Sequence, residues 1–183
     1  MVEPAPPSGR AKATLRARLL AGRRTMPART AGDAARTAAL LAHPLLAAAG
    51  TIAAYASFGT EPDTAALRRE LAARGTTVLL PQVHEDGGLS FRCEDGAVQP
   101  ISAAELLLVP ALAVDSSGMR LGRGGGSYDR VLAGVRVPVL ALLHPGELLA
   151  RVPAEPHDQP VTGVALPGGI AWLAPVPRHA AVG

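Results

Sequence analysis

Apolar runs and amphipathic stretches alternate along most of this chain. Short, nearly continuous apolar runs predict buried strands, because a strand covered on both faces loses its polar alternation. These runs are 51–58, 76–83, 106–114, 137–144 and a weaker one at 161–166. Stretches with helical spacing predict helices at 29–48, 63–75 and 127–134, with a short one at 146–153. The alternation indicates an α/β fold: a three-layer αβα architecture around a mainly parallel sheet, with ligands at the carboxyl ends of its strands.

The stretch 11–24 predicts a further helix, whose apolar positions are three leucines. At about 100° per residue, Lys12, Arg16 and Arg23 fall within about 40° of one another, inside the arc that the leucines define. A charge on a packed face needs an anionic partner or must reach solvent. We therefore expect this stripe to contact an anion, whereas Arg18, well off the arc, is expected to be solvated.

Length and composition predict one globular domain. At 183 residues the chain suits a single core, which we assign to residues 11–174, with tails at 1–10 and 175–183. The first ten residues lack the apolar segment of a signal peptide, and no apolar stretch approaches the ~20 residues of a membrane helix. Cys93 is the single cysteine, so no internal disulfide forms, and we expect a cytoplasmic protein without a membrane partner.

The net charge of +3 is unevenly distributed. Eight basic and two acidic residues among the first 36 give that region a charge of +6, which leaves −3 for the remainder. Two phenylalanines, two tyrosines and one tryptophan offer little surface on which bases could stack. A general nucleic-acid-binding function is therefore disfavoured.

The segment RLGRGGGSYDR, residues 120–130, is the clearest candidate site. Its glycines permit turns that point several amide groups at one anion, and the arginines and the start of the next helix add positive charge. A phosphate is the expected ligand, although an ordinary glycine loop is the alternative. The segment matches neither a Walker sequence nor the dinucleotide fingerprint.

Acidic residues near this segment suggest a metal ion and a polar substrate. Asp129 and Asp158 could hold the Mg²⁺ that accompanies nucleotide phosphates, but a helix cap and a turn are the respective alternatives. Glu61 could accept a hydrogen bond from a substrate amine, whereas Asp63 is expected to cap the following helix. The histidines show no metal-binding spacing, and His157 is the one nearest the proposed site.

Several of these stretches together resemble the 5-formyltetrahydrofolate cyclo-ligase family. The most specific is LLLVPALAVDSSGMRLGRGGGSYDRVL, supported by KATLR, YASFGTEPDT, VLLPQV and VPAEPHDQPV. In that family ATP phosphorylates the formyl oxygen of 5-formyltetrahydrofolate, and a folate amine closes the ring with loss of phosphate. The resemblance implies ATP as co-substrate, Mg²⁺, a reduced folate as substrate, and a monomer or weak dimer.

The resemblance also implies roles for individual residues. Those expected to contact ATP phosphates are Lys12, Arg16, Arg120, Gly122, Arg123, Gly124, Gly125, Gly126, Ser127 and Tyr128. Those expected to border the folate are Ala56, Glu61, Arg123, Gly124 and Gly126, and those expected to hold Mg²⁺ are Asp129 and Asp158. Arg123 and Lys12 are the expected catalytic residues, because phosphoryl transfer is helped by positive charge placed where negative charge develops.

One departure from the family leaves a second hypothesis open. The segment 92–105 is shorter than is usual in the family, where it helps to cover the folate. A relative that binds nucleotide or folate without turnover is therefore the alternative to an enzyme. An RNA-associated protein and a sugar-phosphate isomerase of similar architecture are further alternatives, which the charge distribution and the paired aspartates respectively disfavour.

Overall fold

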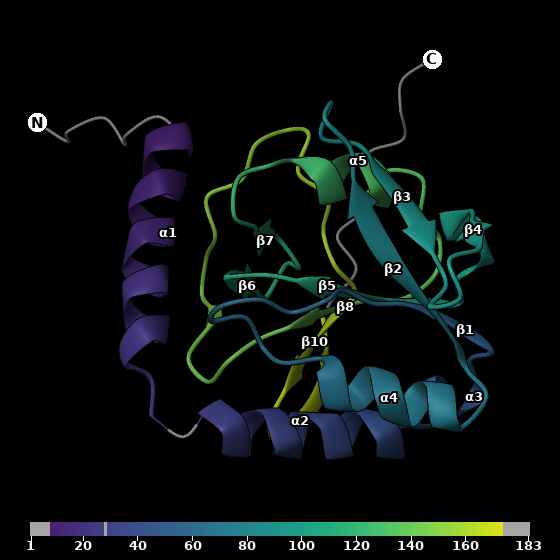
Figure 1. Cartoon of the computed structure of the whole chain (residues 1–183). Helices are drawn as coiled ribbons and strands as arrows, with labels where there is room; N and C mark the ends of the chain where they lie inside the picture. Colours follow the sequence, from purple (N-terminus) through teal and green to yellow (C-terminus); the bar gives the residue numbers. More distant parts are fainter. Residues whose placement is uncertain (1–7, 28, 174–183) are drawn as a thin grey trace, which may run out of the picture.

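A computed structural model describes residues 8–27 and 29–173 of the chain. Most strands belong to one eight-stranded sheet, in the order β11-β10-β8-β5-β1-β2-β3-β4 (Figure 1). Their bounds are β1 Thr51–Ala53, β2 Thr77–Val83, β3 Leu89–Arg92, β4 Val98–Gln99, β5 Leu106–Pro110, β8 Val139–Leu142, β10 Gly163–Leu166 and β11 Gly169–Trp172. The pairs from β10 through β8, β5 and β1 to β2 are parallel, whereas β11, β3 and β4 join antiparallel. The predicted mainly parallel sheet is confirmed.

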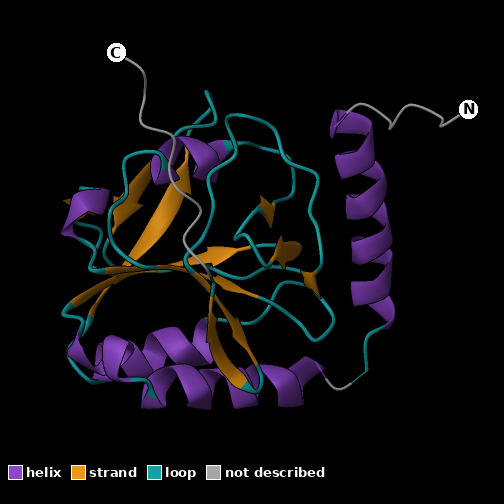
Figure 2. Cartoon of the chain, turned by 180° about the vertical axis from the view of Figure 1, so that it is seen from behind, coloured by secondary structure: helices purple, strands orange, loops and turns teal. Residues whose placement is uncertain are grey.

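Helices lie on both sides of this sheet. They are α1 Ser8–Thr25, α2 Arg29–Ala42, α3 Pro44–Ala48, α4 Ala65–Ala73 and α5 Ser127–Leu132, with a 3₁₀ turn, η1, at Ile101–Ala103. Helices α2, α3 and α4 cover one face, while α5 lies on the other (Figures 1 and 2). The α/β class is therefore confirmed. The buried side chains of Leu40 in α2 and Leu67 in α4 pack with Leu108 of the sheet. This cluster forms the core between these helices and the sheet.

A smaller sheet occupies much of the second face. It contains β6 Ala113–Asp115, β7 Arg120–Leu121 and β9 Leu148–Leu149, in the order β7-β6-β9. Helix α1 stands beside this sheet, and its three leucines pack on the buried Leu112 and Leu121 (Figure 1). The predicted face of α1 is thus confirmed: Lys12 and Arg23 are buried within it, and Arg18 is exposed.

Three predicted elements differ from the observed ones because of local turns. The run 106–114 is divided into β5 and β6, since the chain leaves the large sheet after Pro110. The predicted strand 51–58 ends at Ala53, where a loop begins. The Thr64 hydroxyl donates a hydrogen bond to the Tyr55 carbonyl and holds this loop in place. The predicted helix 29–48 is interrupted at His43, because Pro44 cannot continue the backbone hydrogen bonds of a helix.

The predicted short helix at 146–153 is wrong. Gly146 adopts a φ of 82°, which a helix cannot accommodate, and the backbone then pairs with β6. The Val114 amide donates to the Glu147 carbonyl at 3.1 Å and starts this pairing. Strand β9 therefore replaces the helix, and it brings Glu147 beneath α1.

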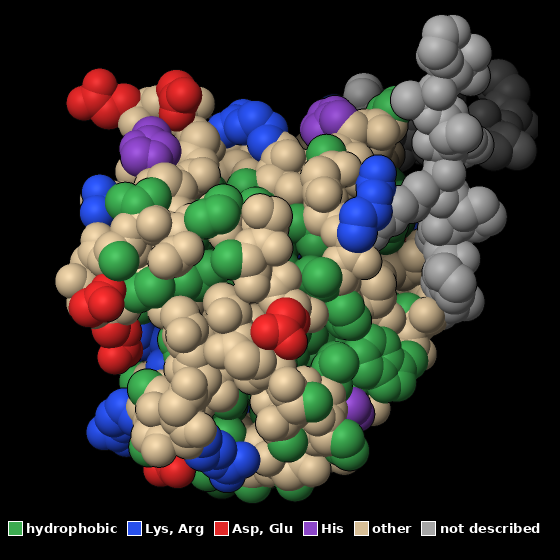
Figure 3. Space-filling model, turned by 90° about the vertical axis from the view of Figure 1, so that its right-hand side faces the viewer, with side chains coloured by type: hydrophobic (Ala, Val, Ile, Leu, Met, Phe, Trp, Pro, Cys, Tyr) green, Lys and Arg blue, Asp and Glu red, His purple; other side chains and the backbone are tan. Residues whose placement is uncertain are grey.

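The described domain begins three residues before the predicted start at residue 11. Residues 8–10, assigned to a tail, belong to α1, while 1–7 lie outside the described residues. The predicted tail at 175–183 also lies outside them. None of the described helices is long and apolar enough to cross a membrane. On the face in Figure 3, acidic and basic side chains are interspersed around apolar patches, without a region of one sign among the residues described there.

Candidate active site

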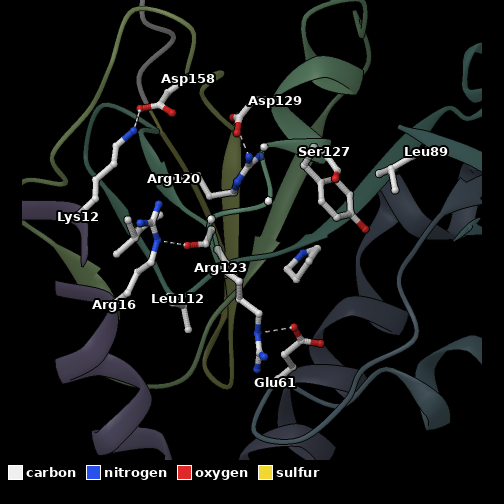
Figure 4. Close-up of a pocket in the computed structure, with 18 of the residues that line it drawn as sticks. Lys12, Arg16, Glu61, Leu89, Leu112, Arg120, Arg123, Ser127, Asp129 and Asp158 are labelled. Carbon is white, nitrogen blue, oxygen red and sulfur yellow. Dashed lines mark hydrogen bonds and ion pairs between the residues drawn. The ribbon is translucent and has the colours of Figure 1, made fainter. Parts of the chain in front are cut away.

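A cavity of about 300 Å³ lies between α1, the glycine segment and the upper end of β2. Its walls come from segments far apart in the chain: α1, the loop 57–61, β2 and β3, the segment 110–112, residues 120–129 and the loop 155–158 (Figure 4). The cavity thus gathers nearly every residue that the sequence analysis proposed. Ala56 is the exception, because it is exposed and is not among the residues that line the cavity.

Lys12 lies at one end of the cavity between two carboxylates. Its Nζ is 2.5 Å from Oε2 of Glu155 and 2.6 Å from Oδ2 of Asp158, and the residue is only 5% exposed. Burial by itself lowers the pKa of the Lys12 ammonium, but the hydrogen bonds to Asp158 and Glu155 outweigh burial, so the pKa is raised. Lys12 is therefore a fixed positive charge at neutral pH.

Arg120 forms the second cationic group of this end. Its Nη2 donates to Oδ1 of Asp129 at 2.8 Å, and the same oxygen accepts the Gln159 amide at 3.2 Å. Burial lowers the pKa of the Arg120 guanidinium. Its Nη1 is buried and has no hydrogen-bond partner. A buried, charged donor without a partner is costly.

Arg16 and the glycine segment form the adjacent wall. The Arg16 Nε donates to the Gly122 carbonyl at 2.8 Å, which anchors the segment to α1 (Figure 4). Gly124 and Gly126 adopt φ values of 111° and 66°, as the sequence analysis expected for a turn that brings backbone close to a ligand. The first two residues of the segment form β7 of the small sheet, so its glycines do not directly follow a strand of the large sheet.

Arg123 points away from the Lys12 end of the cavity (Figure 4). Its Nε lies 3.1 Å from Oε1 of Glu61, and its guanidinium lies over the Phe58 ring, 4.3 Å from the ring centre. Glu61 also accepts the Phe58 amide at 3.1 Å, and it is buried. The carboxylate expected to receive a substrate amine is thus paired with the arginine expected at the phosphates.

The opposite end of the cavity is largely apolar. Pro81, Val83, Leu89 and Phe58 line it together with Tyr128. Burial raises the pKa of the Tyr128 hydroxyl, which therefore stays neutral. No residue of the short segment 92–105 lines the cavity. This end offers apolar side chains near the Glu61 carboxylate, as a heteroaromatic ring with polar edges would need.

The two predicted metal ligands have different surroundings. Asp158 lies with Glu155 and His157, and one ligand atom from each falls within 4.8 Å of the others. Asp129 accepts hydrogen bonds from Arg120 and from the Gln159 amide, and its side chain does not cap α5. Asp158 does lie in a turn, as its alternative predicted: its Oδ2 accepts the Glu155 amide at 2.6 Å, and its own amide donates to the Glu155 carbonyl at 3.0 Å. Asp63 does accept the Ala65 amide at 3.2 Å, as predicted for a residue at the start of α4.

Some lining residues were missed from sequence. Glu155 stands three positions before Asp158 in EPHDQP, and that spacing was the available signal. Phe58 follows β1 in the loop that contains Glu61, but a single aromatic residue there gave no pattern. Arg23 was recognised on the buried stripe, yet its partner Glu147 lay within the segment predicted as a helix.

Sequence comparisons relate the chain to one family of proteins. The sequence model of the 5-formyltetrahydrofolate cyclo-ligase family matches residues 8–99 and 94–167, two stretches that meet within the short segment. The chain is 37% identical to a 5-formyltetrahydrofolate cyclo-ligase of Mycolicibacterium smegmatis over 185 residues, covering 87% of this chain and 95% of that protein. It is 29% identical to the Escherichia coli K12 protein of the same name over 155 residues, covering 72% and 85%.

Solved structures show the same fold. The 5,10-methenyltetrahydrofolate synthetase of Mycoplasma pneumoniae superposes with a TM-score of 0.76 at 20% identity, covering 85% of this chain and 98% of the other. The Aquifex aeolicus 5,10-methenyltetrahydrofolate synthetase gives a TM-score of 0.75 at 21% identity, with coverages of 94% and 99%. With the family match spanning most of its length, the chain belongs to the 5-formyltetrahydrofolate cyclo-ligase family of enzymes.

Proposed function

We propose that this protein converts 5-formyltetrahydrofolate to 5,10-methenyltetrahydrofolate, with ATP and Mg²⁺, and releases ADP and phosphate. Family membership supports the reaction and its co-substrate ATP. In this chain, the main observation that supports the proposal is a single cavity with a cationic end and an apolar end. A phosphate donor and a folate ring system need those two environments side by side.

The cationic end suits the phosphates of ATP. Lys12, Arg16 and Arg120 lie there, beside a glycine segment whose backbone is accessible. Arg120 Nη1 still needs an acceptor, and a phosphate oxygen would supply one. We infer that these groups align the terminal phosphate and neutralise its charge during transfer, which is most of the catalytic work that phosphoryl transfer requires.

The apolar end suits the pterin. Phe58, Pro81, Val83 and Leu89 offer a surface against which the rings can lie, and Glu61 provides a buried acceptor for an N–H group at their edge. Arg123 belongs to the glycine segment, and its guanidinium reaches Glu61 and Phe58 at the apolar end, so we infer that it contacts the formyl oxygen during phosphorylation. The phosphorylated formyl oxygen is a good leaving group when the neighbouring amine closes the ring, and the departing phosphate can accept the proton that this amine loses.

The residues present also fit Mg²⁺. Asp158 and Glu155 offer the hard carboxylate oxygens that Mg²⁺ prefers, on the side of the cavity where the phosphates are proposed. Bound there, the ion would neutralise phosphate charge. Asp129 is the second carboxylate that the family resemblance implies, and it lies beside Arg120. A cytoplasmic location and a monomer or weak dimer remain predictions.

Absorbance near the methenyl-folate band tests the proposal. Purified protein with 5-formyltetrahydrofolate, ATP and Mg²⁺ should produce a rise that needs all three components. Arg123→Ala should be slow, whereas Arg18→Ala, which removes an exposed arginine of α1, should match the wild type. Stoichiometric ATP binding without any rise in absorbance would contradict an enzyme and favour the non-catalytic relative.

A further inference from the structure

Each carboxylate proposed to bind a metal ion or substrate is already paired with a cation proposed to bind phosphate. Lys12 pairs with both Asp158 and Glu155, Arg120 pairs with Asp129, and Arg123 pairs with Glu61. These carboxylates are therefore neutralised by cations of the same cavity. If the proposed function is right, at least one of these pairs must open before nucleotide and metal can bind.

The Lys12 pair is the clearest case of competition for one position. The ammonium contacts Glu155 Oε2 and Asp158 Oδ2, and these are the carboxylates that make up the candidate cation site with His157. A divalent cation and the Lys12 ammonium cannot share those two oxygens, because they would be like charges a few ångströms apart. Binding of the metal thus requires Lys12 to leave.

Lys12 can leave because its charge is carried on a flexible stem. The ammonium is a compact charge on four methylene groups, so it can change partners without movement of α1. Without another anion, however, its displacement would leave a buried positive charge unpaired, which is costly. A phosphate group in the same cavity would remove that cost.

Arg120 supplies an independent sign that an anion binds beside Lys12. Its Nη1 is buried, charged and unpartnered, while its other terminal nitrogen is held by Asp129. Arg120 and Lys12 line the same cavity, and both lie at its cationic end (Figure 4). A phosphate bound beside Arg120 would therefore bring negative charge close to both cations.

From these contacts we propose that Lys12 is a tethered placeholder cation. Its ammonium occupies the Glu155–Asp158 cation site in the free protein, and it moves to the nucleotide phosphate as the divalent cation enters. Metal and nucleotide then bind as a pair, each removing the obstacle to the other. The proposal rests on the proposed function for the identity of the nucleotide, but not for the exchange of cations.

Mn²⁺ binding followed by electron paramagnetic resonance tests the exchange, with Mn²⁺ as the probe and no nucleotide present. Lys12→Gln leaves two carboxylates without their cation, so it should bind Mn²⁺ roughly 5- to 150-fold more tightly than the wild type. Lys12→Arg keeps the charge and should behave as the wild type does. Arg18→Gln is the matched control on the exposed side of α1, and Asp158→Asn in the Lys12→Gln background should abolish the gain.

A second measurement uses the ATP analogue AMP-PNP and calorimetry. Lys12→Gln should bind the analogue with Mg²⁺ more weakly than the wild type, because a phosphate contact is lost. Equal Mn²⁺ affinity of the wild type and Lys12→Gln would overturn the proposal. Tight binding of Mn²⁺ to the wild-type protein would also overturn it, and that measurement does not depend on whether the variant folds.

The two proposals can fail separately. If Lys12→Gln gains Mn²⁺ affinity but the wild type forms no methenyl product, the exchange stands and the cyclo-ligase reaction does not. If product forms and the gain is missing, the reaction stands and Lys12 is not a placeholder.

Discussion

The Arg23 guanidinium of α1 forms a two-point ion pair with the Glu147 carboxylate, from a position 124 residues earlier in the chain. The distances are 2.6 Å for Nε to Oε1 and 2.7 Å for Nη2 to Oε2. Arg23 also donates to the Ala111 carbonyl at 2.5 Å, and Glu147 accepts the His144 amide at 2.8 Å. This buried network fixes the helix that presents Lys12 and Arg16 to the cavity.

Removal of Arg23 should strongly destabilise the fold. In Arg23→Met the Glu147 carboxylate is left buried and without its cation, so we expect a loss of about 3–5 kcal/mol in the free energy of unfolding. Urea denaturation measures it. Arg24→Met, at the exposed neighbouring position, should change the same quantity by less than about 0.5 kcal/mol. A comparable loss in both variants would contradict the assigned role of the ion pair.

Stability should fall with acid because of His144. Burial lowers the pKa of its imidazole from the ordinary 6.5, and the nearby cations Arg23 and Arg36 act in the same direction, against the Thr60 hydrogen bond and Glu147. The unfolded chain therefore binds a proton at a pH where the folded protein does not. The stabilisation is complete above pH 6.5 and is lost as the pH falls through the lowered pKa.

Thermal unfolding measured from about pH 5 to about pH 8 checks this expectation, because histidine side chains titrate in that range. His144→Asn should flatten the acid side of the profile. His84→Asn, at an exposed histidine, should keep the profile of the wild type. An unchanged slope in His144→Asn would assign the acid sensitivity to another group.

Gly118 should tolerate substitution poorly. It has a φ of 84°, and a Cβ there would press on the Val161 carbonyl oxygen, which is backbone and cannot easily move. Gly59 has a φ of 63° but open space around it. Gly59→Ala should cost about 1–2 kcal/mol from backbone strain, and Gly118→Ala should cost more because the clash adds to it. Chemical denaturation of the two variants gives the comparison, and equal losses would show that the clash relaxes.

Substitution of Phe58 should weaken binding of the folate more than binding of the nucleotide. Its ring is 62% exposed, yet it covers the Arg123 guanidinium and borders the apolar end of the cavity. Loss of this cation–π contact in Phe58→Leu is worth about 0.5–1 kcal/mol, so KM for the folate should rise roughly 2- to 5-fold. KM for ATP should stay unchanged. Val98→Leu, at an exposed apolar position away from the cavity, should leave both constants as they are.

Local patterns predicted most of the elements but few of their partners. The parallel core, the inward face of α1 and the glycine segment all followed from spacing and composition over short windows. The predicted helix at 146–153 failed because Gly146 and the pairing of β9 with β6 outweigh a weak amphipathic pattern. The break between β5 and β6 was missed because the residues on both sides of Pro110 are apolar and buried, so the run 106–114 resembled one strand.

The sequence by itself determined which side chains must be buried and which residue types could bind phosphate, because hydrophobic periodicity and glycine chemistry act over a few residues. Tertiary structure alone decided which charges meet. Lys12 reaches Glu155 and Asp158 across 143 and 146 positions, and no local pattern encodes such a distance. Ion-pair partners depend on how the layers pack. That packing, and not the motif, pairs the cations proposed to bind phosphate with carboxylates, so that a nucleotide would compete with the carboxylates and a metal ion with the cations.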